Sequence, residues 1–171
     1  MSMDSELCVL QKLSPYDGVV YYEMLKRIGR KEYDFSNPVH DMSFGDYKLW
    51  LKQQDDWSRG EALPQGYVPQ ICFWLMVGTT PVGLGKIREV QTEQCLLEGG
   101  NIGYAIDSTQ RRRGYGVLIL KLLLEKAKEY SIGKALITVK KYNYASKRVA
   151  EINGATLIKE TEDWWYFEVQ N

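Results

Sequence analysis

The hydrophobic and polar positions change their period near the middle of the chain. Residues 101–107 form a short β-compatible segment, and residues 108–116 are polar and rich in glycine. From Val117 onward, apolar residues recur at helical spacing, with charged residues on the opposite side. The apolar stripe consists of Leu120, Leu123, Leu124 and Ala127. The pattern therefore predicts a strand, a loop and a helix in succession.

The same periodicity argument predicts the other elements. Further strands are expected over residues 7–10, 70–77, 82–90, 134–140, 156–159 and 164–169. Helices are expected from Ser14 and Pro15 to Gly29, from Ser43 onward, and over residues 145–153. Loops are expected over residues 30–41, 57–69 and 91–99. The order predicts an α/β (α+β) fold, in which a mostly antiparallel sheet contains one parallel, right-handed βαβ unit.

Composition narrows the class of protein. The chain has 171 residues, which favours a single domain over residues 1–171. The 22 Lys and Arg residues balance 22 Asp and Glu residues, which disfavours nucleic acid as a partner. The three cysteines form no CxxC pair, and there is no leader-like segment or membrane-length apolar run. We therefore expect a reduced, cytoplasmic protein that does not act at a membrane.

Three arginines and two glycines lie just before and at the start of the predicted central helix. Arg111, Arg112 and Arg113 are followed by Gly114 and Gly116. Glycine lets backbone N–H groups turn toward a ligand, and a helix N-terminus adds unpaired donors and partial positive charge. We interpret the loop as a phosphate or pyrophosphate site, held more by the backbone than by the arginine side chains. A solvated charged turn is the alternative.

These residues resemble a known family. The RxxGxG spacing of residues 111–116, placed between a strand and a helix, resembles the acetyl-CoA-binding signature of the GNAT superfamily of N-acetyltransferases. Asn143-x-x-Ser146 is similar to the second cofactor segment of that superfamily. Residues 98–104 look like those of a bacterial predicted-acetyltransferase subgroup. The match covers roughly residues 71–169, and it implies a GNAT-like sheet with helices on both faces.

The resemblance implies that an acetyl group passes from acetyl-CoA to a primary amine, directly within a ternary complex and without a metal. The loop would wrap the pyrophosphate, and the pantetheine arm would lie between strands 104–107 and 136–140, which splay apart in this fold. Backbone groups of Ala105 and Asp107 would then pair with the amides of the arm. The implied cofactor-binding residues are Ala105, Ile106, Asp107, Arg111, Arg112, Arg113, Gly114, Tyr115, Gly116, Val117, Asn143 and Ser146.

The resemblance also implies how the thioester is activated. The backbone N–H of Ile106 would polarise the thioester carbonyl. The resemblance assigns no base, and we expect Glu98, with Glu89 as the other candidate, to deprotonate the acceptor ammonium. A covalent cysteine route is not expected, because no cysteine has a histidine or a basic residue beside it in the sequence.

The general acid of the superfamily is missing. It is commonly a tyrosine four residues after the Ser146 position, where this sequence has Ala150. Tyr144 is the expected substitute, with Tyr142 as the alternative. The thiolate could also leave without an acid, because a thiol pKa near 8.5 makes it a tolerable leaving group.

Several alternatives remain open. The substitution of Ala150 also suits a non-catalytic acyl-CoA-binding or sensor domain, and the arginines could belong to a nucleic-acid-binding module. The acceptor could be a small-molecule amine or a protein or peptide amine, and the protein a monomer or a homodimer. We interpret His40 as a surface residue, Gly83-Leu84-Gly85 as part of a hairpin rather than a dinucleotide loop, and residues 164–167 as core packing.

Overall fold

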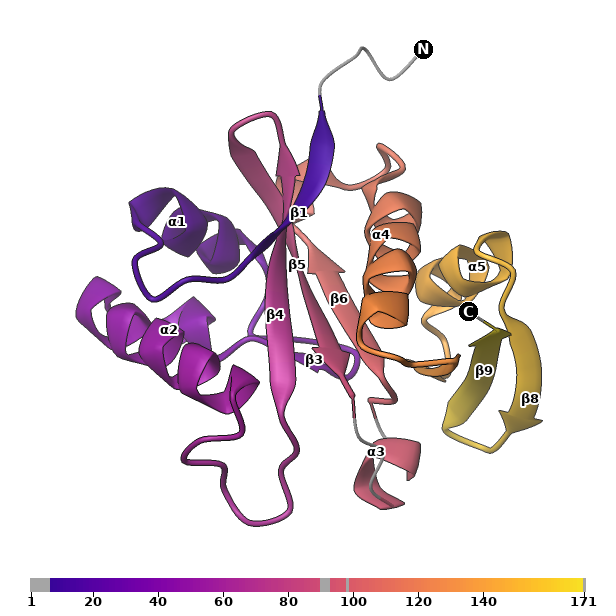
Figure 1. Cartoon of the computed structure of the whole chain (residues 1–171). Helices are drawn as coiled ribbons and strands as arrows, with labels where there is room; N and C mark the ends of the chain where they lie inside the picture. Colours follow the sequence, from indigo (N-terminus) through magenta and orange to yellow (C-terminus); the bar gives the residue numbers. More distant parts are fainter. Residues whose placement is uncertain (1–6, 90–92, 98, 171) are drawn as a thin grey trace.

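Two antiparallel sheets form the centre of the fold in the computed structural model, which describes residues 7–89, 93–97 and 99–170 (Figure 1). The first sheet has the order β1-β4-β5-β6, and the second has the order β7-β9-β8. The strands of the first are β1 (Cys8–Lys12), β4 (Gln70–Val77), β5 (Thr80–Arg88) and β6 (Ile102–Ile106). Those of the second are β7 (Lys134–Lys140), β8 (Thr156–Glu160) and β9 (Trp164–Gln170). The predicted α/β fold with mostly antiparallel strands is confirmed. All strand pairs in the described part of the chain are antiparallel, so the predicted parallel pairing of β6 with β7 is not formed, and the sheet divides between them into two half-sheets.

Helices cover both faces of the first sheet (Figure 1). α1 (Val19–Arg27) and α2 (Phe44–Ser58) lie on one face, and α4 (Tyr115–Glu129) lies on the other. α5 (Tyr144–Ile152) packs against α4 and β7. The short elements are the hairpin of β2 (Lys31–Glu32) and β3 (Phe35–Ser36), the helical turns η1 (Pro38–Asp41) and η2 (Ser108–Gln110), and α3 (Glu93–Leu97). No helix in this described part of the chain is long and apolar enough to cross a membrane.

The alternation of side chains along β4 divides the core into two clusters. Phe73 and Leu75 belong to the cluster beneath α4, whereas Trp74 and Met76 belong to the cluster beneath α1 and α2. β4 is buried on both faces, so its sequence is continuously apolar instead of alternating. The first cluster holds α4 against β5 and β6, which places the N-terminus of that helix at the end of β6.

Asn101 joins the two half-sheets where they meet. Its backbone N–H donates to the Leu136 carbonyl at 2.8 Å, and its side-chain oxygen accepts from the Leu136 N–H at 2.8 Å. Its side-chain amide donates to the Arg88 carbonyl at 2.9 Å. Gly100 has a φ of 53°, and a Cβ there would lie 2.4 Å from the Leu136 oxygen, so only glycine fits. The half-sheets therefore touch at this end of β6 and diverge toward Ile106.

Gly83 and Gly85 serve packing within the sheet. A Cβ on Gly83 would lie 2.8 Å from the Ala105 carbonyl oxygen, and one on Gly85 would lie 2.7 Å from the Leu123 side chain of α4. Both residues lie inside β5, which runs antiparallel to β4 and β6. The structure thus places this glycine pair in a strand hairpin, as interpreted from the sequence.

Several predicted boundaries need correction. The first helix begins at Val19, because Asp17 accepts hydrogen bonds from the Ser14 N–H and the Trp74 indole, both at 2.7 Å, and this holds residues 14–17 in a turn. The predicted loop at 30–41 contains the β2–β3 hairpin and η1, and the loop at 91–99 contains α3. The helix at Ser43 is confirmed: the Ser43 hydroxyl accepts from the Asp46 N–H at 3.1 Å, as an N-cap.

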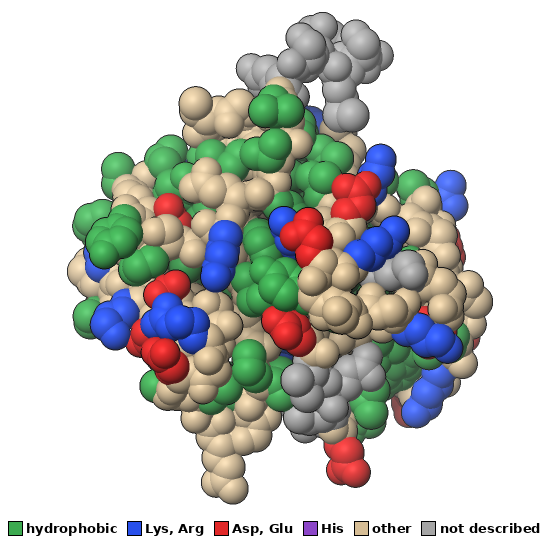
Figure 2. All heavy atoms as spheres, in the orientation of Figure 1, with side chains coloured by type: hydrophobic (Ala, Val, Ile, Leu, Met, Phe, Trp, Pro, Cys, Tyr) green, Lys and Arg blue, Asp and Glu red, His purple; other side chains and the backbone are tan. Residues whose placement is uncertain are grey.

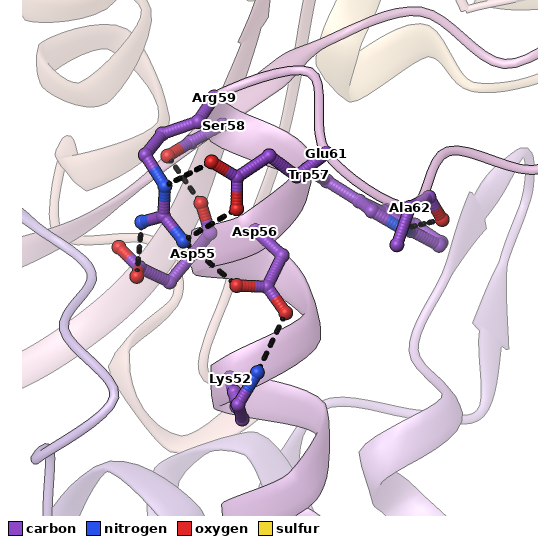
Figure 3. Close-up of polar contacts among 8 residues, drawn as sticks. All are labelled: Lys52, Asp55, Asp56, Trp57, Ser58, Arg59, Glu61 and Ala62. Carbon is purple, nitrogen blue, oxygen red and sulfur yellow. Dashed lines mark hydrogen bonds and ion pairs between the residues drawn. The ribbon is translucent and has the colours of Figure 1, made fainter.

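A network of charges closes the C-terminal end of α2 (Figure 3). The Arg59 guanidinium contacts the carboxylates of Asp55, Asp56 and Glu61, and Lys52 donates to Asp56 at 2.9 Å. These contacts lower the pKa of Asp56, with the Lys52 hydrogen bond as the largest cause. Charges of both signs are also interspersed over the face shown in Figure 2, in keeping with the balanced composition.

Candidate active site

A cavity of about 570 Å³ opens where the two half-sheets diverge. β6 and β7 form its walls, the loop before α4 closes one end, and the start of α5 lies along one side. The β2–β3 hairpin covers the other side, next to Lys86 of β5. The cavity therefore brings together the loop, the strand and the Asn143 segment that sequence reasoning selected separately.

The loop before α4 presents backbone donors at one end of this cavity. Gly114 is the N-cap of α4 in the left-handed conformation, with φ 83° and ψ −3°, and no side chain caps the helix. The first N–H groups of a helix have no intrahelical partner, so those of α4 are available to an anion. Gly114 and Gly116 both line the cavity, with Tyr115 and Val117 beside them. This is the geometry expected of a main-chain phosphate site.

The arginines of the loop have different environments. Arg111 donates to the Ile106 carbonyl at 3.2 and 3.1 Å and forms an ion pair with Glu32 of β2. Its guanidinium thus ties the loop to the end of β6 and to the hairpin. Arg112 and Arg113 are exposed, and of these two only Arg112 lines the cavity. The structure therefore gives Arg111 a positioning contact instead of an open one.

The backbone of β6 corrects one expectation. The Asp107 N–H donates to the Val82 carbonyl at 2.9 Å, so it is not open to a ligand. Ala105 lies opposite Leu84, and alternation along an antiparallel ladder turns its N–H and C=O toward β5 as well. The same alternation turns the amides of Tyr104 and Ile106 away from β5, toward the cleft. The backbone groups of Ala105 and Asp107 are therefore not open to pair with the arm, contrary to expectation.

Asp107 contributes through its side chain instead. Its carboxylate is fully buried and accepts from Arg27 Nε of α1 at 2.8 Å and from the Thr109 N–H at 2.9 Å. These contacts fix the turn that leads from β6 into the loop, and they connect that turn to α1.

The start of α5 carries the second predicted segment into the cavity. The Asn143 side chain accepts from the Ser146 N–H at 3.2 Å, and both residues line the cavity with Val149. Asn143 therefore caps α5 as well as facing the cleft. Ala150 is fully buried, so nothing polar replaces the missing tyrosine at that position.

The two tyrosines named as substitutes lie elsewhere. Tyr144 is 63% exposed, its ring lies 5.6 Å from that of Trp165, and it does not line the cavity. Tyr142 is 75% exposed and also lies outside the lining. The structure therefore does not bring Tyr144 to the site. Of the candidate bases, Glu98 lies outside the described residues, and Glu89 is exposed beyond the end of β5, outside the cavity lining.

A tyrosine that sequence reasoning missed lies inside the cavity. Tyr104 points from β6 toward the α4 and α5 side. Its hydroxyl is the one buried side-chain polar atom among the described residues that has no hydrogen-bond partner. Burial raises its pKa to about 12, although the neighbouring Ser146 acts in the opposite direction. The available signal in the sequence was the hydroxyl of Tyr104, which lies between the apolar residues Ile102 and Ile106 on the same face of the strand.

Lys86 is the second residue that was missed. It lies on the β5 face that carries α1 and α2, with Nζ 4.8 Å from the centre of the Phe35 ring. Burial lowers its pKa, and the neighbouring Arg88 charge acts in the same direction. A lysine within the apolar run of β5 was the available signal. Lys86, Arg88 and Phe35 line the side of the cavity away from α5.

The remaining candidate residues from the sequence make structural contacts and do not line the cavity. Cys72 is buried, donates to Gln54 Oε1 at 3.5 Å, and has a pKa raised by burial, as expected of an inert thiol. His40 donates from Nδ1 to the Ile28 carbonyl at 3.0 Å, away from the cavity lining.

Comparison with known proteins gives one family match over most of the chain. A family model described as "Acetyltransferase (GNAT) domain" matches residues 9–156. No curated protein matches the sequence significantly.

Solved structures share the fold at low sequence identity. Campylobacter jejuni N-acetyltransferase PseH, in complex with acetyl coenzyme A, matches with a TM-score of 0.66 and 14% identity, over 96% of this chain and 99% of that one. RimL, a ribosomal L7/L12 alpha-N-protein acetyltransferase in complex with coenzyme A, matches with a TM-score of 0.71 and 14% identity, over 98% of this chain and 95% of that one. The microcin C7 self-immunity acetyltransferase MccE, in complex with acetyl-CoA and AMP, matches with a TM-score of 0.72 and 14% identity, over 98% of this chain and 94% of that one.

Proposed function

The chain belongs to the GNAT acetyltransferase family, and we propose that it transfers an acetyl group from acetyl-CoA to a primary amine, directly within a ternary complex. The observation that carries this proposal is the cavity between β6 and β7, which ends at the uncapped N-terminus of α4. A cleft between strands suits an extended amide-bearing arm, and a helix N-terminus suits a pyrophosphate.

The residues of the cavity fit coenzyme A. Backbone N–H groups from Gly114 to Val117 would hold the pyrophosphate, with Arg112 beside them. The amides of Tyr104 and Ile106 at the open edge of β6 would pair with the arm, and Asn143 would contact it from α5. Bound acetyl-CoA would supply the activated acetyl thioester. Of the cofactor residues expected from the sequence, Arg111 and Asp107 would position the loop by their own contacts.

We assign the reaction steps to residues of this chain. The N–H of Ile106, which points into the cleft, would donate to the thioester oxygen as it gains negative charge. Glu98 stays the proposed base for the acceptor ammonium. Direct transfer is favoured over a cysteine intermediate because the buried Cys72 thiol has a raised pKa, and the thiolate is the nucleophilic form.

The acceptor would enter on the side of the β2–β3 hairpin. Lys86, Arg88 and Phe35 line that side of the cavity, opposite the start of α5. Both a small-molecule amine and a peptide or protein amine suit an opening of this kind. RimL is named for a ribosomal-protein acceptor, and we take its likeness in fold as a reason to include peptides in the test.

The test combines product analysis with kinetics. Mass spectrometry would follow acetyl-CoA with a panel of diamines, amino sugars, amino acids and N-terminal peptides, and a 42 Da increase on one class would identify the acceptor. Initial rates should give intersecting double-reciprocal lines, because both substrates are bound at once. Parallel lines, or an acetylated enzyme that needs Cys72, would contradict direct transfer.

A second function is favoured by one observation. Ala150 is buried at the position where the superfamily commonly has its acid, which also suits a non-catalytic acyl-CoA-binding or sensor domain. This alternative predicts acetyl-CoA binding without transfer to any amine of the panel. We further propose a cytoplasmic location and a monomer or homodimer, and sedimentation of the purified protein would decide between the two states.

A further inference from the structure

The Tyr104 hydroxyl is buried and forms no hydrogen bond of good geometry, although the Ser146 side chain is a polar neighbour. Tyr104 lies in the middle of β6, and its ring occupies the space between that strand and the start of α5. Among the described residues no other buried side-chain polar atom lacks a hydrogen-bond partner. A buried polar group without a hydrogen bond lowers the stability of the fold, so its presence beside a cavity indicates that a ligand supplies the missing partner.

We propose that the Tyr104 hydroxyl donates a hydrogen bond to the coenzyme A sulfur when the acetyl group leaves it. This inference rests on the proposed function and adds a catalytic residue to it. The donor comes from a strand, whereas sequence reasoning looked for it on α5.

The position along β6 favours the sulfur over other parts of the cofactor. The loop that would hold the pyrophosphate follows Ile106, so the arm would run from there toward Asn101, where the half-sheets meet. Tyr104 lies two residues farther into the cleft than Ile106, which is about 6.6 Å along a strand. The reacting end of the arm would therefore come past Ile106 to Tyr104.

The neighbouring helix α5 has no tyrosine that could donate this hydrogen bond. Ser146 and Val149 of α5 line the cavity beside Tyr104, and Ala150 in the next position has no polar group. Tyr142 and Tyr144 lie outside the lining. Among the residues that the structure describes, three tyrosines line the cavity, Tyr33, Tyr104 and Tyr115, and of these only Tyr104 has a buried hydroxyl without a hydrogen-bond partner.

The chemistry is stabilisation of the leaving group. The acceptor nitrogen forms its bond to the acetyl carbon, the carbon–sulfur bond breaks, and its electron pair remains on sulfur. The amine proton passes to the base and then to water. Tyr104 keeps its own proton, because its pKa of about 12 lies above that of a thiol, near 8.5. Its O–H would hold the thiolate until coenzyme A dissociates and takes a proton from solvent.

The test compares coenzyme A with acetyl-CoA, whose sulfur cannot ionise. Calorimetry would measure both affinities between pH 7 and pH 9.5 for wild type and Tyr104→Phe. In wild type we expect coenzyme A to gain about 10-fold in affinity relative to acetyl-CoA as pH rises, because the bound thiolate is stabilised. In Tyr104→Phe the gain should stay below about 2-fold, and kcat should fall about 10- to 100-fold.

Tyr166→Phe is the matched control. It also removes the hydroxyl of a buried tyrosine, but that hydroxyl donates to the Leu97 carbonyl at 3.1 Å, outside the cavity. It should keep the wild-type pH dependence. An equal gain for coenzyme A in wild type and Tyr104→Phe would overturn the role of Tyr104 alone. Failure of the folded protein to bind either ligand would overturn the role and the proposed function together.

Discussion

Asn101 and Leu136 exchange two hydrogen bonds, each of 2.8 Å, across the line where the two half-sheets separate. Asn101 is 1% exposed, and its side-chain amide also reaches the Arg88 carbonyl of β5. One buried side chain thus completes the backbone groups of both sheets at their junction. Because the strands meet here and part toward the loop, this contact defines the inner end of the cavity.

Removing the Asn101 side chain should destabilise the fold. In Asn101→Ala, the Leu136 N–H and the Arg88 carbonyl lose their partner while buried, which should lower the free energy of unfolding by about 3 kcal/mol. Thr138→Val is the control, because it removes only the acceptor of the Gly99 N–H at the same junction and should cost about 1 kcal/mol. Urea titrations would measure both. A cost for Asn101→Ala no larger than that of the control would contradict its joining role.

Arg111 should matter more to stability than to cofactor affinity. Its guanidinium is engaged by Glu32 and the Ile106 carbonyl, so Arg111→Met should raise the acetyl-CoA dissociation constant less than about 5-fold. It should lower the unfolding free energy by about 1–2 kcal/mol. Glu32→Gln removes the same ion pair, so the double variant should be less destabilised than the sum of the two. A 100-fold loss of affinity in Arg111→Met would show that its side chain binds the pyrophosphate.

The Tyr104 hydroxyl should reduce stability in alkaline solution. Burial raises its pKa from 10.0 to about 12, so the folded state holds this proton at pH values where the unfolded state has lost it. The stabilising contribution is complete below pH 10 and is lost as pH rises through about 12. At pH 11 wild type should have lost about 1.4 kcal/mol that Tyr104→Phe does not lose. Urea titrations at pH 9 and pH 11 would give this difference, and identical losses in both proteins would contradict it.

The regular elements could be predicted from local pattern alone. β4 and β7 were predicted with their observed bounds, because β4 is an almost continuous apolar run, β7 is rich in β-branched residues, and turn signals flank both. The stripe on α4 likewise predicted the buried residues Leu120 and Leu123. The start of α1 was missed because the Asp17 carboxylate is held by the Trp74 indole, 57 residues away in sequence.

The site was predictable only where it depends on a local motif. The loop before α4 and Asn143 line one cavity, as the resemblance to the family implied. The sequence could not show which backbone amides of β6 face the cleft, because this depends on the register in which β6 pairs with β5. Tyr104 and Lys86 were missed for a similar reason, since their places in the cavity depend on how the two half-sheets diverge.

The most direct measurement is calorimetric titration of acetyl-CoA into wild type, Gly114→Glu and Gly66→Glu. Gly114 and Gly66 have φ values of 83° and 82° and open space around a Cβ, so both changes carry the same backbone strain. Only Gly114 lines the cavity. We predict saturable binding to wild type and Gly66→Glu, and none to Gly114→Glu at about 1 mM ligand, because a negative side chain would occupy the pyrophosphate position. Equal binding to all three folded proteins would contradict the site, and no binding to any would contradict the function.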